Sequence, residues 1–201
     1  GDFYEMFFDD AIVASKELEI ALTGKSCGLE ERAPMCGVPF HSADSYMARL
    51  VAKGYKVAIC EQMEDPALAK GLVKREVVRV LTPGTVIENS MLNEGRNNFL
   101  ASVYFAGESA GVCFIDVSTG SVNLTELAAP ALPDKIINEI GRFMPSEIVF
   151  NSASSSLTKV FSFISNKTEA LAQELGDDYF DPQSSAEIIL KHFKKDSLSE
   201  L

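Results

Sequence analysis

The 201-residue sequence predicts two α/β domains joined by a linker, and three observations support this fold class. Amphipathic helical segments and short apolar strands alternate along the chain, which is the pattern of α/β proteins. A polar stretch over residues 88–98, with several asparagines and a glycine, interrupts the pattern near the middle. The chain is 46% apolar and 23% charged, as globular domains are, which excludes collagen, coiled coil and general disorder.

The first predicted element is an amphipathic helix over residues 4–19. Its apolar stripe repeats at steps of four, three and four residues, through Phe7, Ala11, Ala14 and Leu18. A strand over residues 20–23 and a polar loop over residues 24–32 are expected to follow. The prolines at both ends of residues 34–39 exclude a helix there, because proline lacks a backbone donor.

A second helix is predicted over residues 43–53, with Ser42 as its N-cap and Gly54 as its terminator. Two strands, over residues 55–60 and 72–81, follow it, separated by a polar turn and a short helical piece. The dipeptide Pro83-Gly84 predicts a type II turn that closes the first domain. We therefore expect the first domain over residues 1–85 and the linker over residues 86–98.

The second domain is expected over residues 99–201. It opens with three short strands joined by tight turns, which predict an antiparallel meander over residues 99–106, 112–117 and 121–127. Helices are predicted over residues 133–144, 157–164 and 182–194, with a strand over residues 147–150. Asp181 and Pro182 give the last helix a capping side chain and a proline at its first position.

The net charge of −11 predicts repulsion from nucleic acids and from anionic membranes. A local exception is the basic strip formed by Lys70, Lys74, Arg75 and Arg79. A nucleic-acid-binding function must therefore rest on a small positive patch or on shape. No apolar run is long enough to span a bilayer, and no secretory signal begins the chain. Because the chain starts without a methionine, we expect it to be a piece of a longer protein.

The motifs of several enzyme classes are missing from the sequence. It contains no phosphate-binding loop and no dinucleotide-binding fingerprint, and its two histidines have no partners that suggest nucleophilic catalysis. The four cysteines lack a CxxC pair, so we expect free thiols and no metal site, although zinc at Cys27, Cys36 and His41 is conceivable.

Two alternatives to a nucleic-acid-binding function remain open. One is a metal-dependent nuclease of ribonuclease-H type centred on Asp116, which follows an apolar strand. Aspartate commonly opens turns, so the better explanation of Asp116 is a turn former at the end of the strand. The other alternative is an acidic protein-interaction module.

The first seven residues, GDFYEMF, have two interpretations. In one, Phe3 packs into a core, and Glu5 lies in the first turn of the helix and complements its dipole. In the other, an exposed aromatic at a rigid corner inserts between base pairs from the minor groove and kinks the duplex. Composition and spacing leave both interpretations open.

Four blocks in the first half of the chain together resemble the MutS family of bacterial DNA mismatch-recognition proteins. The blocks are Gly1–Phe7, Pro34–His41, Val57–Gln62 and Lys74–Thr85. The meander after the linker resembles the family's connector domain, which has a ribonuclease-H-like fold without nuclease activity. The resemblance covers the whole chain and is strongest up to residue 85. It implies a mixed-sheet mismatch-recognition domain followed by a ribonuclease-H-like connector.

The resemblance also implies roles for particular residues. Phe3 matches the family's intercalating aromatic, and Glu5 matches its base-contacting carboxylate. Cys36 departs from the small residue, often alanine, that is expected at its position. The residues expected to contact the DNA backbone or groove are Lys25, Met35, Gly37, Pro39, Lys74, Arg75 and Arg79.

The function that the resemblance implies is mismatch recognition in DNA mismatch repair, in a bacterial cytoplasmic protein that joins the nucleoid when bound to DNA. The implied partners are mismatched double-stranded DNA, a MutL-type protein bound through the connector and, in the full-length family, a second copy. This piece itself is expected to be a monomer that binds no membrane. ATP and Mg²⁺ belong to an ATPase region that we expect to lie outside this piece, so we expect neither a cofactor nor enzymatic activity here. We also expect the first domain to lack its N-terminal start and the connector to lack its C-terminal end.

Overall fold

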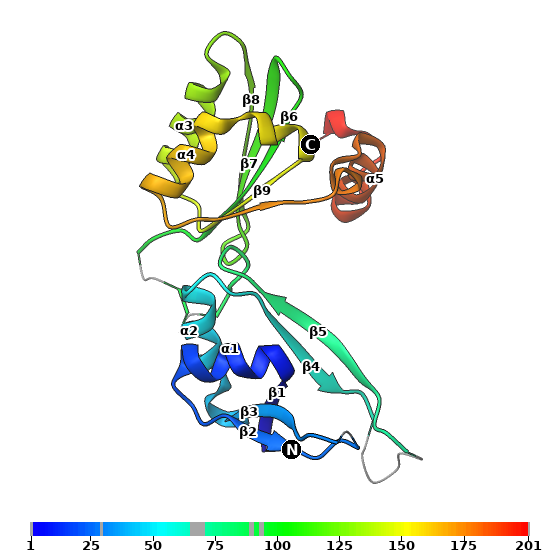
Figure 1. The fold of residues 1–201 in the computed structure, drawn as a ribbon. Helices are drawn as coiled ribbons and strands as arrows, with labels where there is room; N and C mark the ends of the chain where they lie inside the picture. The colour runs from blue at the N-terminus through cyan, green and yellow to red at the C-terminus, as the bar shows by residue number, and fades with distance from the viewer. Residues whose placement is uncertain (1, 29, 65–70, 89–90, 93–94, 201) are drawn as a thin grey trace. The chain divides into compact units, whose positions relative to one another are not determined.

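A computed structural model of the chain describes residues 2–28, 30–64, 71–88, 91–92 and 95–200 (Figure 1). The chain divides into two compact units, Gly1–Arg96 and Asn97–Leu201. Both units combine helices with β-sheet, as predicted for an α/β protein. The sheet of the second unit is mixed, whereas the described strand pairs of the first unit are all antiparallel, so the expectation of a mixed sheet in the first domain is wrong for these strands. No helix among the described residues is both long enough and apolar enough to cross a membrane.

The first unit contains a three-stranded antiparallel sheet and a separate two-stranded hairpin. The sheet has the order β1-β3-β2, from β1 (Phe3–Phe7), β3 (Ala33–Pro39) and β2 (Thr23–Lys25). Helices α1 (Phe8–Leu18) and α2 (Ala43–Ala52) accompany this sheet. The hairpin pairs β4 (Val57–Gln62) with β5 (Arg75–Leu81), as Figure 1 shows.

The prediction of a helix over residues 4–19 is wrong at its start, because residues 3–7 form strand β1. Phe8 then enters the helix with a left-handed φ of 51°, so strand and helix follow each other without a loop. The antiparallel partner of β1 is β3, some 30 residues away in the sequence. Glu5 therefore lies in the middle of a strand and not in a first helical turn.

Two other expectations for the first unit need correction. The predicted strand over residues 20–23 is displaced to β2, which begins at Thr23. The turn after β5 does form, with the Thr85 amide donating to the Thr82 carbonyl at 3.0 Å. However, Gly84 does not have the positive φ that a type II turn requires. The helical piece expected between β4 and β5 falls mainly on residues 65–70, outside the described residues.

The core of the first unit lies between the sheet and its helices. The predicted stripe of α1 is buried at Ala11, Ala14 and Leu18, and it packs against Cys36 and Val38 of β3. The thiol of Cys36 donates to the carbonyl of Ala11 at 3.5 Å, and burial raises its pKa. Cysteine thus fits as a small buried side chain where a smaller residue was expected.

The second unit has a mixed five-stranded sheet of order β10-β9-β6-β7-β8. Strands β6 (Phe99–Phe105), β7 (Ser109–Asp116) and β8 (Ser121–Ala128) form the predicted antiparallel meander. Strands β9 (Glu147–Phe150) and β10 (Leu171–Glu174) continue the sheet in parallel pairing. Strand β10 is not predicted from the sequence, because its four residues, LAQE, include no β-branched or aromatic side chain.

Three helices complete the second unit close to their predicted bounds: α3 (Leu132–Phe143), α4 (Thr158–Lys167) and α5 (Pro182–Phe193). Helices α3 and α4 bury one face of the sheet, with Phe114, Ile136 and Phe150 among the fully buried side chains. The Asp181 carboxylate accepts from the Ser184 amide at 2.8 Å and caps α5, as predicted.

Candidate nucleic-acid interface

Strand β1 sends alternate side chains to opposite faces of the three-stranded sheet. Tyr4 and Met6 turn toward the core of the first unit. Phe3, Glu5 and Phe7 occupy the other face. Across the antiparallel pairing, their partners are Pro39, Gly37 and Met35, in that order. We call this surface the outward face and define it by Phe3, Glu5, Phe7, Lys25, Met35, Gly37 and Pro39.

Phe3 is a surface residue at the start of β1, with 58% of its area exposed. This exposure excludes the interpretation of Phe3 as a core aromatic within this chain. Gly37 lies on β3 opposite Glu5, close to the side chains of both Phe3 and Glu5. A Cβ atom at Gly37 would lie 3.6 Å from the Phe3 ring, 3.8 Å from Glu5 Cγ and only 3.1 Å from the Tyr4 carbonyl oxygen. The absence of a side chain at Gly37 therefore lets the two outward side chains flank an open strip of backbone.

The charge of Glu5 is compensated locally. Lys25 Nζ donates to Glu5 Oε2 at 2.6 Å, and it also lies 5.4 Å from the centre of the Phe7 ring. Both partners of the ion pair are substantially exposed. The outward face therefore presents uncharged residues, two of them aromatic, around one ion pair whose charges compensate each other, on a chain whose net charge is −11.

The other expected cations lie on the hairpin and not on the outward face. Lys74 Nζ pairs with Glu76 at 2.6 Å, and the guanidinium of Arg75 donates to the Val73 carbonyl at 3.2 Å. Arg79 forms a two-pronged ion pair with Glu88. The structure thus brings Lys25, Met35, Gly37 and Pro39 together with Phe3 and Glu5, and places Lys74, Arg75 and Arg79 on a neighbouring element. Lys70 lies outside the described residues.

Sequence reasoning missed one link between these two elements. The hydroxyl of Tyr4 donates to the carboxylate of Glu61 on β4, and the Tyr4 ring packs against Phe40 with centroids 5.6 Å apart. A strand assignment for residues 3–7 would have pointed to Tyr4, because alternation puts it on the face opposite Phe3 and Glu5.

Asp116, at the end of β7, has its carboxylate occupied by protein donors. It accepts from the Ser118 amide and hydroxyl at 2.9 and 2.6 Å, from the Thr119 amide at 3.3 Å, and from Asn97 Nδ2 and the Asn98 amide at 2.8 and 3.2 Å. Burial alone would raise the pKa of Asp116, but the hydrogen bonds outweigh burial and lower it. This geometry confirms the interpretation of Asp116 as a turn former. Among the described residues, no three His, Cys, Asp or Glu side chains are grouped to hold a metal ion.

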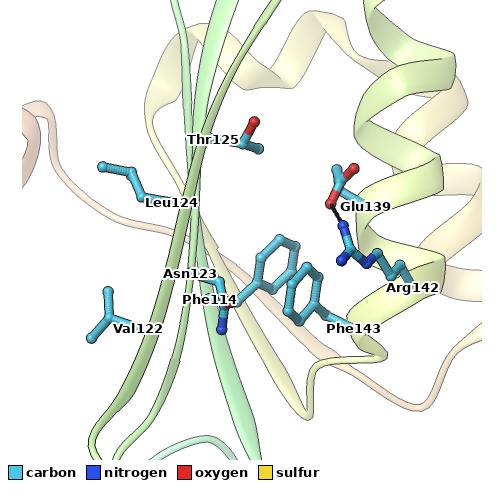
Figure 2. Close-up of a pocket in the computed structure, with 8 residues that line it drawn as sticks. All are labelled: Phe114, Val122, Asn123, Leu124, Thr125, Glu139, Arg142 and Phe143. Carbon is cyan, nitrogen blue, oxygen red and sulfur yellow. Dashed lines mark ion pairs between the residues drawn. The ribbon is translucent and has the colours of Figure 1, made fainter.

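A cavity of about 390 Å³ lies beside β8 and α3 in the second unit (Figure 2). The stacked rings of Phe114 and Phe143, 4.1 Å apart, form one wall. Glu139 and Arg142 on α3 pair with each other at 3.7 Å. Because these two charges already compensate each other, the cavity is a weaker candidate for a functional site than the outward face.

Comparison with known families is consistent with this geometry. The family model of MutS domain I matches residues 1–90, and that of MutS domain II matches residues 98–201. A protein of Ruminiclostridium cellulolyticum named DNA mismatch repair protein MutS is 52% identical over 199 residues, or 99% of this chain and 23% of the relative. A protein of the same name from Clostridioides difficile is 54% identical over 181 residues, or 90% of this chain and 19% of the relative.

The chain therefore spans only about a fifth of the length of these curated relatives. Within that span, the two domain models cover both compact units, and the second model alone matches more than half of the residues. This chain belongs to the MutS family.

Proposed function

We propose that this chain supplies the mismatch-reading part of a DNA mismatch repair protein, with Phe3 as the intercalating residue and Glu5 as the base-contacting residue. One observation carries the proposal. Phe3 and Glu5 lie side by side on the outward face, free of the core, while Tyr4 between them faces the core. The relatives, whose names identify them as mismatch repair proteins, support the coarser part of the proposal, a role in mismatch repair.

The exposed ring of Phe3 acts through the lower cost of opening DNA at a mismatch. A mispaired base is poorly held, so unstacking and bending there cost less than in a fully paired duplex. Stacking of an aromatic ring on such a base contributes about 1–3 kcal/mol and does not depend on base identity. Phe3 therefore selects weak pairing and not a particular sequence.

Glu5 improves the discrimination by penalising paired DNA. A carboxylate repels the polyanion, and a base in a correct pair has already used its hydrogen-bonding edge. A mispaired base can offer a free ring N–H as a donor to Glu5, and this hydrogen bond offsets part of the repulsion. The cost of bringing Glu5 into the groove is thus largest where no mismatch is present.

The remaining expected residues position the duplex. Contacts to phosphates fix register without reading sequence, which suits a protein that must act in any sequence context. We assign this role to Lys25 beside Glu5 and to Lys74, Arg75 and Arg79 on the hairpin. Phosphate would replace the acidic partners of Lys25, Lys74 and Arg79 and the carbonyl partner of Arg75. Met35, Gly37 and Pro39 would lie against the groove wall.

The second unit corresponds to the connector in this proposal. It would pass the DNA-bound state of the first unit to the ATPase region of a longer protein and to a MutL-type partner. ATP, Mg²⁺ and the contacts of a homodimer would belong to regions outside this chain. No residue of the second unit is assigned a catalytic role.

The decisive experiment replaces Phe3 by alanine in the full-length protein that contains this chain. Affinities are measured for a duplex with one G·T mismatch and for its fully paired counterpart. Because Phe3 is exposed, Phe3→Ala should change the free energy of unfolding by less than about 0.5 kcal/mol, while the preference for the mismatch collapses. Phe193→Ala is the matched control, since Phe193 is 54% exposed in the second unit; it should leave the preference unchanged. A stability loss of about 3–5 kcal/mol, the size expected for truncation of a core aromatic, with discrimination intact would overturn the proposed role of Phe3.

A further inference from the structure

We propose that Tyr4 is a positioning residue that fixes the recognition strand β1 to the β4–β5 hairpin through Glu61, and so sets Phe3 and Glu5 at a defined distance from the hairpin cations. This inference rests on the proposed function of Phe3 and Glu5. It adds a residue that does not touch DNA but determines how the base-reading and phosphate-binding elements act together.

The contact itself is specific. Tyr4 lies between Phe3 and Glu5 in sequence and turns to the opposite face of β1, where its hydroxyl donates to Glu61. Hydrogen bonding to Glu61, together with burial and the negative charges of Glu61 and Asp44, raises the pKa of Tyr4 to about 12. The hydroxyl therefore keeps its proton, and remains a donor, throughout the range in which DNA binding is measured.

The hairpin has one buried end and one outer end. At the buried end, Leu81 is fully buried and packs with Val57 and Ile59 against residues of α2. Glu61 lies beyond this cluster, toward the outer end, so the bond from Tyr4 adds a second point of attachment. Two separated attachments fix the direction of a two-stranded ribbon, which on its own twists and bends readily.

The outer end also carries two of the three hairpin cations, Lys74 and Arg75, whereas Arg79 lies opposite Ile59, nearer the buried end. Gln62, next to Glu61, pairs with Arg75 across the hairpin. Lys74 follows, and its carbonyl accepts from the Met63 amide at 2.9 Å. A chain of backbone and side-chain contacts therefore runs from β1 through Tyr4 and Glu61 to Arg75 and Lys74. Phosphates would bind at the hairpin end of this series of contacts, and a base would contact Phe3 and Glu5 at the other end. A loose contact between the two ends would lower the fraction of encounters in which both interactions form together.

The test is Tyr4→Phe in the full-length protein, which removes the hydroxyl and keeps the ring. We expect the ratio of the two dissociation constants, paired over mismatched, to fall by about threefold to tenfold, as loss of one hydrogen bond allows. Affinity for fully paired DNA should stay within about twofold, because nonspecific binding depends on phosphate contacts and not on their alignment with Phe3. Tyr55→Phe is the matched control, since the Tyr55 hydroxyl donates to Glu17 at 3.0 Å elsewhere in the same unit; it should leave the ratio unchanged.

A double-mutant cycle isolates the Tyr4–Glu61 bond from general damage. Glu61→Ala removes the acceptor, and adding Tyr4→Phe to it should cause no further loss of discrimination. Glu61→Gln retains an acceptor oxygen and should keep most of the ratio. A lower melting temperature for Tyr4→Phe with an unchanged ratio would show a purely structural role and overturn the inference. The same follows if the losses from Tyr4→Phe and Glu61→Ala simply add.

The two proposals fail in different ways. If Phe3→Ala leaves discrimination intact, the proposed function itself is wrong. If Phe3→Ala abolishes discrimination while Tyr4→Phe does not reduce it, only the positioning role is wrong.

Discussion

Glu5 carries the same sign of charge as the DNA that it is proposed to contact. The structure shows how this charge is held before binding, since Lys25 reaches across from β2 and donates to it at 2.6 Å. Exposed ion pairs of this kind contribute at most about 1 kcal/mol, so the pair can open or rearrange at small cost. The ion pair with Lys25 therefore orients Glu5 next to Gly37 but can break at small energetic cost.

Replacing Glu5 by glutamine keeps the shape of the side chain and removes its charge. We expect Glu5→Gln to bind fully paired DNA more tightly, because the repulsion from the duplex is gone. The ratio of the affinity for mismatched DNA to the affinity for paired DNA should therefore decrease. Titrations of paired and G·T duplexes against both proteins measure this directly. A weaker affinity for paired DNA in the variant would show that the carboxylate does not act by repulsion.

Lys25 has two possible roles, and the salt dependence of binding separates them. As a phosphate contact, its replacement in Lys25→Met should weaken binding to paired and mismatched DNA alike. The slope of log K against log salt should then fall by about 0.9. If Lys25 acts only on Glu5, the slope stays the same and the mismatch preference changes. Binding isotherms at several salt concentrations distinguish the two outcomes.

At the scale of elements, most of the architecture follows from local sequence signals. The meander, the helices of the second unit and the buried stripe of α1 agree with periodicity, turn residues and caps. Residues 3–7 are an exception to this agreement between local signals and structure. Their apolar side chains continue the helical stripe of α1, and only pairing with β3, a distant segment, makes them a strand. Such tertiary pairing overrides local propensity, and a single sequence does not reveal it.

The candidate site shows the same limit. The motif GDFYEMF pointed to Phe3 and Glu5, but the helical assignment put Glu5 in the wrong local environment. The ion pair with Lys25 could not be foreseen, because the strand that carries Lys25 was expected at residues 20–23. The bond between Tyr4 and Glu61 joins elements 57 residues apart, and no local pattern encodes it.

Asp116 ties the end of β7 to the turn that follows and to the start of β6. Asp116→Asn replaces one of the two carboxylate oxygens with an NH₂ group, which cannot accept a hydrogen bond. The hydrogen bonds to that oxygen are therefore lost. We expect the second unit to lose about 1–3 kcal/mol of stability, measured by urea unfolding. Cleavage assays with Mg²⁺ and Mn²⁺ accompany the measurement. Reproducible DNA cleavage that Asp116→Asn abolishes would revive the nuclease alternative.

The pH dependence of the same variant gives an independent check. Folding lowers the pKa of Asp116 below 3.8, so the folded state favours the ionised form. The resulting contribution to the free energy of unfolding is fully present above the pKa that Asp116 has in the unfolded chain. It is lost as the pH falls through the lower pKa of the folded state. Below about pH 4 the native protein should therefore lose stability faster than Asp116→Asn.

At the scale of the whole chain, electrostatics oppose DNA binding. A net charge of −11 gives poor long-range attraction, and the hairpin cations are already paired with acidic groups or the backbone. The affinity of a full-length relative must therefore draw on more than these two units. In our proposal the outward face supplies discrimination, and we expect most of the binding energy to come from regions outside these two units.

We accordingly expect this 201-residue chain alone to be a monomer that binds a G·T duplex weakly or undetectably at physiological salt. Sedimentation and fluorescence anisotropy with labelled duplex test both statements. Sub-micromolar binding by the isolated chain would place the source of affinity within these two units.

The alternation along β1 has a consequence for protein engineering. Neighbouring residues of this strand serve separate purposes, since Tyr4 and Met6 pack inside while Phe3 and Glu5 are exposed. A library that varies only the solvent-facing positions should keep cooperative folding, because it leaves the packed side chains untouched. Selection from such a library against duplexes with oxidised or alkylated bases would turn the three-stranded sheet into a scaffold for sensors of chosen DNA lesions.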